Sequence, residues 1–458
     1  MMRIAIDMQG TQGSGRPRGI GRYTLALAEG LIRMNTEHEI ILVASGLFPD
    51  SVAWMRSHFQ GKLPQENIRT WTAPGPVDFI SGHQNAWRRN AAELLREAFL
   101  ASLNPDIVLI SSMIEGIGDN SVTSVGKYPA KMKVAAVVYD LIPLLNQELY
   151  LANPAFRHWY MEKLSHLKNA DLFLAISESS RRETIDHAQI PEDRIVNIST
   201  ATDQKFHVRQ VNPVEIAALQ KRIGIEKPFV FYCGGSDARK NLPRLISAYA
   251  ALPGKLRGGH QLLLTGTIPQ HDIAALKAYG EKIGLSPSEL IITGYLDDND
   301  ILLLYQSCRC FALPSWHEGF GLPALEAMSC GAPVIGSNTS SIPEVIGNPE
   351  ALFDPFNEQA ISKKIAKVLT DEHFRLALIH RGLAQCKKFS WDLTARRTLA
   401  AFESLVKEDK SPPPEPAETV RNLIREISRL PGFATGQSDL LGLATAIDTN
   451  FPELISAT

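Results

Sequence analysis

The stretch His317-Glu318-Gly319-Phe320-Gly321-Leu322-Pro323-Ala324-Leu325-Glu326-Ala327-Met328 joins a glycine-rich loop to the start of a helix. Pro323 suits the first helical position because its missing N–H would be unpaired there, and Gly331 supplies a matching stop. A helix start preceded by small residues favours an anion such as a phosphate. Two carboxylates, Glu318 in the loop and Glu326 expected in the first turn of the helix, would repel a phosphate but suit the hydroxyl groups of a sugar and a ribose. The stretch therefore indicates a nucleotide-sugar site, against the plainer interpretation of a helix cap in which Glu326 favours the dipole.

On either side of this stretch, short apolar runs alternate with helical patterns along both halves of the chain. Near-continuous apolar runs of this length indicate strands buried on both faces of a parallel sheet. In the first half the runs are 3–7, 40–44, 107–110, 134–138 and 172–176, and in the second they are 229–232, 261–265, 290–293, 309–313 and 333–336. The pattern predicts two doubly wound, Rossmann-like α/β domains that face each other across a cleft.

The domain limits follow from where this alternation is interrupted. We predict an N-terminal domain over residues 1–205 and a C-terminal domain over residues 206–388. An amphipathic helical pattern over 391–406 lies within a third segment, 389–410. A Pro-rich linker and a helical tail, together residues 411–458, complete the C-terminal helical extension.

Composition excludes several classes of protein. With 458 residues the chain is too long for a single core, and 44% hydrophobic with 21% charged residues is a normal globular balance. A net charge of -2 gives no reason to expect nucleic acid binding. The apolar runs all fall well short of the ~20 residues that a membrane-spanning helix needs. The five cysteines lie mostly in apolar runs and predict reduced thiols in a cytoplasmic protein.

Glu318 and Glu326, with Gly-Phe-Gly-Leu-Pro between them, resemble the Glu-x7-Glu signature of retaining glycosyltransferases of family 4. Members of that family have the two-domain GT-B fold, and their terminal helix crosses back to the first domain. The resemblance implies that the helix within residues 389–410 crosses back to the N-terminal domain in the same way. The resemblance extends through Tyr232–Asn241 and Ser337–Val345. It implies that Glu318 contacts the donor sugar, that Glu326 contacts the ribose hydroxyls, and that backbone N–H groups from Phe320, Gly321 and Leu322 onward hold the donor diphosphate.

A pair of cations, Arg239 and Lys240, follows the strand at 229–233 and a two-glycine turn. Cations at the carboxyl edge of such a sheet would neutralise a departing nucleoside diphosphate, and similar enzymes use an Arg/Lys pair in this way. Many of them carry an arginine nearer the strand end, where this chain has Gly234. The departure leaves Arg239 and Lys240 as the predicted cationic pair, against the plainer interpretation of solvated helix surface.

Asp140 ends the strand at 134–138, where many relatives have His-Asp and this chain has Tyr139-Asp140. A carboxylate at this position could orient or deprotonate the acceptor hydroxyl, or it could cap the next turn. Both roles stay open for Asp140 at this point.

Two further segments are site candidates because of the resemblance. Gly19, Gly21 and Arg22, in a glycine-rich loop after the first strand, would approach the donor diphosphate or the acceptor. Tyr295 and Leu296 follow the strand at 290–293 and would line the pocket for the nucleobase. The acidic run after them mimics a metal motif, but Asp297 is better explained as the N-cap of a following helix, and we predict no metal site.

Within the family, the segments Gly19–Tyr23, Tyr139–Pro143 and Gly234–Asn241 resemble bacterial mannosyltransferases that build O-antigen and other surface polysaccharides. This likeness implies transfer of mannose from GDP-mannose, as an α-linkage, to a growing surface polysaccharide or lipid-linked glycan. The nucleotide-sugar would be a co-substrate, with no cofactor and no metal. A UDP-hexose donor and a low-activity sugar-nucleotide-binding module of a larger glycan polymerase are the open alternatives.

The same likeness predicts where the protein works. It implies a cytoplasmic enzyme, with a place at the inner face of the cytoplasmic membrane and peripheral membrane or complex association as open alternatives. The tail resembles a connector into a second transferase module, so a longer multi-domain chain is also an open alternative.

Overall fold

The computed structural model describes residues 1–13, 16, 19–81, 86–130, 132–407, 416–432 and 437–452, which form two compact units. The first unit comprises Met1–Ile176, Arg181–Ile198 and Trp391–Thr458, and the second comprises Ser177–Ser180 and Ser199–Ser390. The predicted main boundary lies at 205/206, whereas the contacts within each unit place it at 198/199. The difference arises because the segment after Ile198 packs with the second unit, where the Phe206 ring lies 6.1 Å from the Tyr305 ring.

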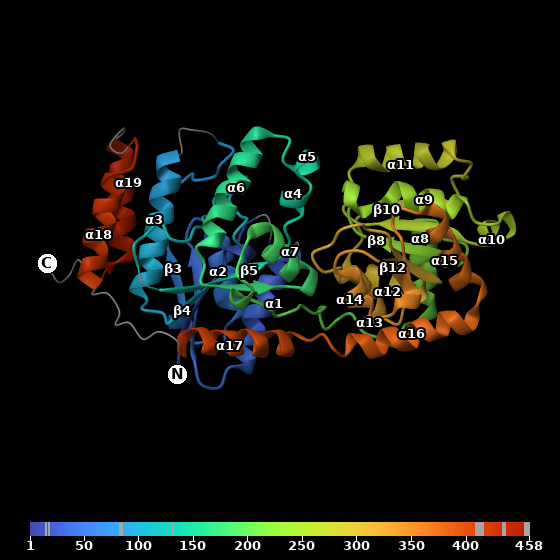
Figure 1. Ribbon diagram of the computed structural model, residues 1–458, viewed down its shortest axis with the longest axis horizontal. Coiled ribbons are helices and arrows are strands. Elements are labelled where there is room, and N and C mark those ends of the chain that lie inside the picture. Colours follow the sequence, from blue (N-terminus) through green and yellow to red (C-terminus); the bar gives the residue numbers. More distant parts are fainter. Residues whose placement is uncertain are drawn as a thin grey trace. The chain divides into compact units, whose positions relative to one another are not determined.

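The first unit is built on a seven-stranded parallel sheet with the order β3-β2-β1-β4-β5-β6-β7 (Figure 1). The central strands are buried along almost their whole length, as the apolar runs predicted. The strands are β1 (Arg3–Asp7), β2 (Glu39–Ser45), β3 (Ile68–Trp71), β4 (Ile107–Ile110), β5 (Lys133–Val138), β6 (Leu172–Ala175) and β7 (Ile195–Asn197).

Helices cover this sheet on both faces, which confirms the doubly wound prediction for this half. Helix α1 lies against α17, and Gly30 permits the approach, because a Cβ there would meet the backbone oxygen of Trp391 at 3.1 Å. The helices are α1 (Gly19–Met34), α2 (Pro49–His58), α3 (Ala86–Ser102), α4 (Ile142–Leu145), α5 (Gln147–Tyr150), α6 (Pro154–Lys168), α7 (Glu178–Ala188, from Arg181 onward), α17 (Trp391–Lys407), α18 (Pro416–Ser428) and α19 (Gln437–Asn450).

The two C-terminal helices are packed parts of the first unit. Both α18 and α19 contact α3 and lie beside it in Figure 1. Leu423 and Phe451 are buried in the same core as the sheet. The Asn450 amide accepts from the Thr72 N–H at 2.7 Å and donates to the Thr72 carbonyl at 2.8 Å, so it pairs with the backbone where edge strand β3 ends. Residues 411–415 of the predicted Pro-rich linker lie outside the described residues.

The second unit contains a six-stranded parallel sheet with the order β10-β9-β8-β11-β12-β13. Its strands are β8 (Phe229–Cys233), β9 (Gln261–Thr265), β10 (Leu290–Gly294), β11 (Cys310–Leu313), β12 (Val334–Ser337) and β13 (Leu352–Phe353). Its helices are α8 (Pro213–Ile223), α9 (Leu242–Ala250), α10 (Gly254–Gly258), α11 (Gln270–Lys282), α12 (Asp298–Ser307), α13 (Leu322–Ser329), α14 (Ile342–Ile346), α15 (Glu358–Thr370) and α16 (Glu372–Cys386). Two Rossmann-like domains with a helical C-terminal extension confirm the predicted fold class.

None of the helices in the described part of the chain combines the length and apolar character that crossing a membrane would require. The five cysteines are all free thiols.

The packing of α18 gives a stability prediction. Leu423→Ala should lower the free energy of unfolding of the first unit by about 2–5 kcal/mol, because truncating a fully buried leucine leaves a cavity. Leu441→Ala, on α19 at 70% exposure, is the matched control and should change it by less than about 0.5 kcal/mol. Urea unfolding of both variants measures the difference, and equal effects would contradict the docking of α18.

Candidate functional site

The predicted donor residues lie in loops at the carboxyl edge of the second sheet. Strands β8 and β11 are parallel neighbours, so the segments that follow them emerge side by side. Lys240 follows β8 in a short 3-10 helix, Ala238–Lys240, and Glu318 follows β11. The hydroxyl of Ser341 donates to the carbonyls of Glu318 (2.9 Å) and Phe320 (2.8 Å), and the Glu318 N–H donates to Ser340 Oγ (3.0 Å). These bonds fix the backbone that carries Glu318.

The Glu318 carboxylate is paired with both predicted cations. Its Oε2 lies 2.7 Å from Nη1 of Arg239, and its Oε1 lies 2.6 Å from Nζ of Lys240. The same Arg239 nitrogen donates to the His317 carbonyl at 2.9 Å. Glu318 is only 6% exposed. Burial alone would raise the pKa of its carboxyl, but the charges of Lys240 and Arg239 outweigh burial and lower the pKa to about 2.

The short helix with the two cations is itself anchored. Asn241 adopts a left-handed conformation with φ 61°, and its amide donates to the carbonyls of Pro314 (3.0 Å) and Pro355 (2.7 Å). The Trp316 N–H donates to the Arg239 carbonyl at 2.9 Å. Asp237 also lies 3.5 Å from Nε of Arg239, but its carboxylate is 41% exposed and therefore screened by solvent. The cations are thus tied to the loop that carries Glu318.

The helix after the glycine-rich loop begins as predicted, with one correction. Gly321 is the N-cap of α13 at φ 100°, a left-handed conformation that favours glycine, and Leu322 and Pro323 open the helix. The N–H groups of this first turn have no carbonyl within the helix and suit an anion. The prediction of Glu326 in the first turn was wrong, because the helix begins at Leu322 and Glu326 is its fifth residue. Its Oε2 accepts from the Tyr305 hydroxyl at 3.1 Å.

The predicted base-pocket residues lie farther along the same edge of the sheet. Tyr295, 71% exposed, and Leu296 follow β10, which β9 separates from β8. The hydrogen bonds and ion pairs found within the described residues do not join them to the Glu318 cluster. The N-cap prediction for Asp297 is confirmed, because its carboxylate accepts from the N–H groups of Asn299 (3.0 Å) and Asp300 (2.9 Å).

In the first unit the predicted acceptor-side residues gather near the ends of β1 and β5. The loop prediction for Gly19, Gly21 and Arg22 was wrong, since the helix α1 starts at Gly19 and they form its first turn. The Tyr23 ring lies 5.2 Å from the ring of Tyr139, next to Asp140. Residues 14, 15, 17 and 18 of the predicted loop lie outside the described residues.

Asp140 caps the turn that follows it, which is one of the two roles predicted for this residue. Its Oδ1 accepts from the Ile142 N–H at 3.1 Å, at the start of α4, and the residue is half-buried. The capping contact and a role toward an acceptor are compatible, because a carboxylate has about four acceptor sites.

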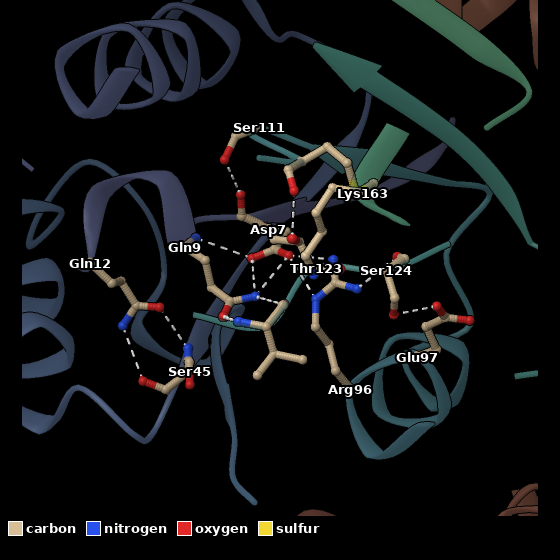
Figure 2. Close-up of polar contacts among 12 residues, drawn as sticks. Asp7, Gln9, Gln12, Ser45, Arg96, Glu97, Ser111, Thr123, Ser124 and Lys163 are labelled. Carbon is tan, nitrogen blue, oxygen red and sulfur yellow. Dashed lines mark hydrogen bonds and ion pairs between the residues drawn. The ribbon is translucent and has the colours of Figure 1, made fainter. Parts of the chain in front are cut away.

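A buried polar network supports the carboxyl end of β1 (Figure 2). Asp7, the last residue of β1, is paired with Arg96 from α3 and accepts from Arg96 Nε at 2.8 Å. Arg96 also donates to the Ser124 carbonyl at 3.1 Å. Gln9 donates to the Val122 carbonyl at 2.6 Å and accepts from the Val122 N–H at 2.8 Å. The network holds the segment after β1 against the Val122–Ser124 segment.

Two residues with polar groups near the candidate sites, Glu115 and Tyr305, were not predicted from the sequence. Glu115, in the segment after β4, accepts from Ser112 Oγ at 2.8 Å, and burial, with the nearby charges of Asp119 and Asp7, raises the pKa of its carboxyl to about 7. The only signal for it was an acidic residue soon after a buried strand. Tyr305 lies within an apolar helical pattern, in which a tyrosine is expected to be a buried core residue.

Within the described residues, no group of three or more His, Cys, Asp or Glu side chains could hold a metal ion. The positive groups of the candidate site are the side chains of Arg239 and Lys240.

The ion pairs of Glu318 predict a pH-dependent contribution to stability. Its folded-state pKa lies below the ordinary 4.5, so its contribution is present above pH about 4.5 and is lost as the pH falls toward about 2. Glu318→Gln should therefore destabilise the second unit at pH 7 and much less at pH 3. Denaturant unfolding at the two pH values tests this, and a difference independent of pH would contradict the pairing.

Two family descriptions match the chain. Residues 17–206 match "Glycosyltransferase Family 4" and residues 216–385 match "Glycosyl transferases group 1". The chain is 36% identical to the serotype-specific mannosyltransferase WbdA of Escherichia coli, over 98% of this chain and 53% of WbdA. It is also 36% identical to the O-antigen chain mannosyltransferase B of E. coli, over 60% of this chain and 72% of that protein. The chain thus spans about half the length of the WbdA relatives that it matches.

Solved structures show the same fold at low sequence identity. HepE of Anabaena, in complex with UDP and glucose, superposes with a TM-score of 0.62 at 18% identity, covering 88% of this chain and all of HepE. WaaG, a glycosyltransferase involved in lipopolysaccharide biosynthesis, gives a TM-score of 0.59 at 17% identity, covering 87% of this chain and 98% of WaaG.

Proposed function

This chain belongs to glycosyltransferase family 4, and from that premise we propose that it is a retaining hexosyltransferase that moves mannose from GDP-mannose to a glycan acceptor. The observation that carries the proposal is the buried carboxylate of Glu318 held between Arg239 and Lys240, beside the start of α13. Carboxylates suit sugar hydroxyls, and cations with a helix start suit a diphosphate. The site therefore offers both halves of a nucleotide-sugar a partner.

Each part of the proposed donor is assigned to its own set of residues. The diphosphate meets Arg239, Lys240 and the N–H groups of the loop and first turn at Phe320, Gly321 and Leu322. Glu318 accepts from hydroxyls of the sugar, and Glu326 accepts from hydroxyls of the ribose. Tyr295 and Leu296, which follow β10 at the same edge of the sheet, are proposed to line the base. In the first unit, Asp140 and the first turn of α1 (Gly19, Gly21 and Arg22) are the proposed acceptor side.

The low pKa of Glu318 decides which chemistry it can perform. A carboxyl with a pKa of about 2 is a weak base and, with a cation on each oxygen, a weak nucleophile. We therefore assign it to sugar binding. Transfer then proceeds on one face of the sugar: the bond from C1 to the phosphate oxygen breaks, the acceptor oxygen bonds to C1, and the acceptor proton passes to the departing phosphate.

Stabilisation of the departing diphosphate is the main catalytic contribution in this scheme. A preorganised donor aimed at developing negative charge typically contributes about 3–4 kcal/mol to the rate. Because two side-chain cations and a helix start supply the positive charge, the proposed reaction needs no metal and no other cofactor.

Mannose is proposed as the sugar because E. coli proteins named as mannosyltransferases are 36% identical to the chain. The proposed acceptor is a growing O-antigen or other lipid-linked glycan at the inner face of the cytoplasmic membrane. The second candidate is a sugar-nucleotide-binding module of a larger glycan polymerase, which the match to about half of WbdA favours.

Calorimetric titration of the purified chain with GDP, UDP and ADP, without added metal, tests the donor. We expect GDP to bind most tightly. Preference for UDP would retain the reaction but replace mannose from GDP-mannose with a UDP-hexose. Failure of all three nucleotides to bind would contradict the proposed donor site.

Substitution of the ion cluster tests the reaction itself. Lys240→Ala and Glu318→Ala should each lower the transfer rate by about 100-fold or more, because each removes a charged partner of the donor. The control is Lys255→Ala on α10, an exposed lysine, which should retain the wild-type rate. Transfer of labelled mannose from GDP-mannose to a mannose-containing acceptor measures all three, and wild-type rates in both site variants would refute the assignment.

A further inference from the structure

We propose that Tyr305 is a positioning residue that holds the Glu326 carboxylate for the ribose diol of the donor, and so makes the site selective for ribonucleotides. The inference rests on the proposed function, because it assigns a supporting residue to the same donor site. It begins from the hydrogen bond that the Tyr305 hydroxyl donates to Glu326 Oε2 at 3.1 Å.

The Tyr305 ring is fixed by its surroundings. It is 0% exposed, and its centroid lies 5.3 Å from that of Phe311 on β11 and 5.5 Å from that of Phe231 on β8. Phe206 packs edge-on at 6.1 Å. A phenol locked in this way has little freedom to lose when it binds a neighbour, so its hydroxyl is a preorganised donor.

The hydroxyl keeps its proton at every working pH. Burial raises the pKa of Tyr305 well above its ordinary value, and the neighbouring Cys233 and Glu326 raise it further. The hydroxyl therefore remains a neutral donor, and it orients the carboxylate without cancelling its charge. Glu318 differs in this respect, because its partners are two cations.

Two helices meet at Glu326. It lies on α13 and Tyr305 lies on α12, and these two helices contact each other. Burial and the charge of Glu326 raise the pKa of the Cys233 thiol, at the end of β8, to about 12, so this thiol keeps its proton. Since a carboxylate has about four acceptor sites, the bond from Tyr305 leaves capacity for a ribose hydroxyl.

The proposed role predicts that the site prefers ribonucleotides to nucleotides without ribose hydroxyls, and this preference can be measured. A charge-assisted hydrogen bond to a hydroxyl contributes only when the carboxylate points at that hydroxyl. Tyr305→Phe keeps the ring and its packing but removes the oxygen that sets the Glu326 rotamer. The variant should therefore weaken binding of a ribonucleotide and leave a nucleotide without ribose hydroxyls unaffected.

The experiment compares GDP with 2′,3′-dideoxy-GDP by calorimetry, or UDP with its dideoxy counterpart if UDP binds more tightly. We expect the wild type to prefer the ribonucleotide by about 10- to 100-fold, the range for hydrogen bonds to a charged group. In Tyr305→Phe the preference should fall to about threefold or less, with the dideoxy affinity unchanged. The matched control is Tyr249→Phe, a buried tyrosine on α9 whose hydroxyl donates to the Arg257 carbonyl at 3.4 Å. It should keep the wild-type preference.

If Tyr305→Phe lowers the midpoint temperature of thermal unfolding, its effect on binding could come from lost stability, so a second variant is needed. Glu326→Gln retains the tyrosine and should lose the same preference, because it removes the charge that the ribose hydroxyl meets. Wild-type preference in either variant would overturn the inference, as would a wild type that binds both nucleotides equally. Failure of the wild type to bind any nucleotide would instead overturn the proposed function, so the two failures are distinguishable.

Discussion

The ion cluster of Arg239, Glu318 and Lys240 is the constraint on which the donor side of the molecule depends. A carboxylate that is almost fully buried is stable only when charges and hydrogen bonds replace its water. Those partners come from the segment after β8, while Glu318 comes from the segment after β11, so the adjacency of these two strands is a precondition of the cluster. Asn241 and the Ser340–Ser341 segment then fix the backbone on both sides.

The same edge of the sheet holds two glutamates with different partners, and the difference assigns them different tasks. Glu318 faces two cations, which lower its basicity and place positive charge beside it. Glu326 faces a neutral phenol, which orients it and leaves its charge in place. In the proposed function, the first environment suits a diphosphate and the second suits a ribose diol. The Glu-x7-Glu spacing therefore accounts only for the two glutamates. Their partners come from other elements, namely the segment after β8 and helix α12.

The sequence predicted the features that depend on local pattern. Buried parallel strands read as continuous apolar runs, so the runs at 40–44 and 261–265 located β2 and β9 correctly. Strands β3, β7 and β13 were missed because these edge strands of two to four residues form no apolar run. The helical turn of Glu326 was wrong by one residue, since helix ends depend on cap geometry that Pro323 only suggests. Tyr305 was missed because its role depends on contacts between α12 and α13, which no spacing in the sequence encodes.

The two buried ion clusters differ in how their charges are partnered, and this difference distinguishes a structural role from a ligand-binding one. In the first unit, Asp7 and Arg96 pair one to one, and Arg96 also bonds a backbone carbonyl, so the charges are matched and the pair stabilises the end of β1. In the second unit, one buried carboxylate meets two cations that stay partly exposed, Arg239 at 21% and Lys240 at 13% of their side-chain surface, and Asp237 also lies 3.5 Å from Nε of Arg239. Accessible positive charge beside a helix start can receive an anion, whereas the Arg96 side chain in the first unit is fully buried. The accessibility of the two cations is thus an argument for the proposed diphosphate besides the motif that first suggested one.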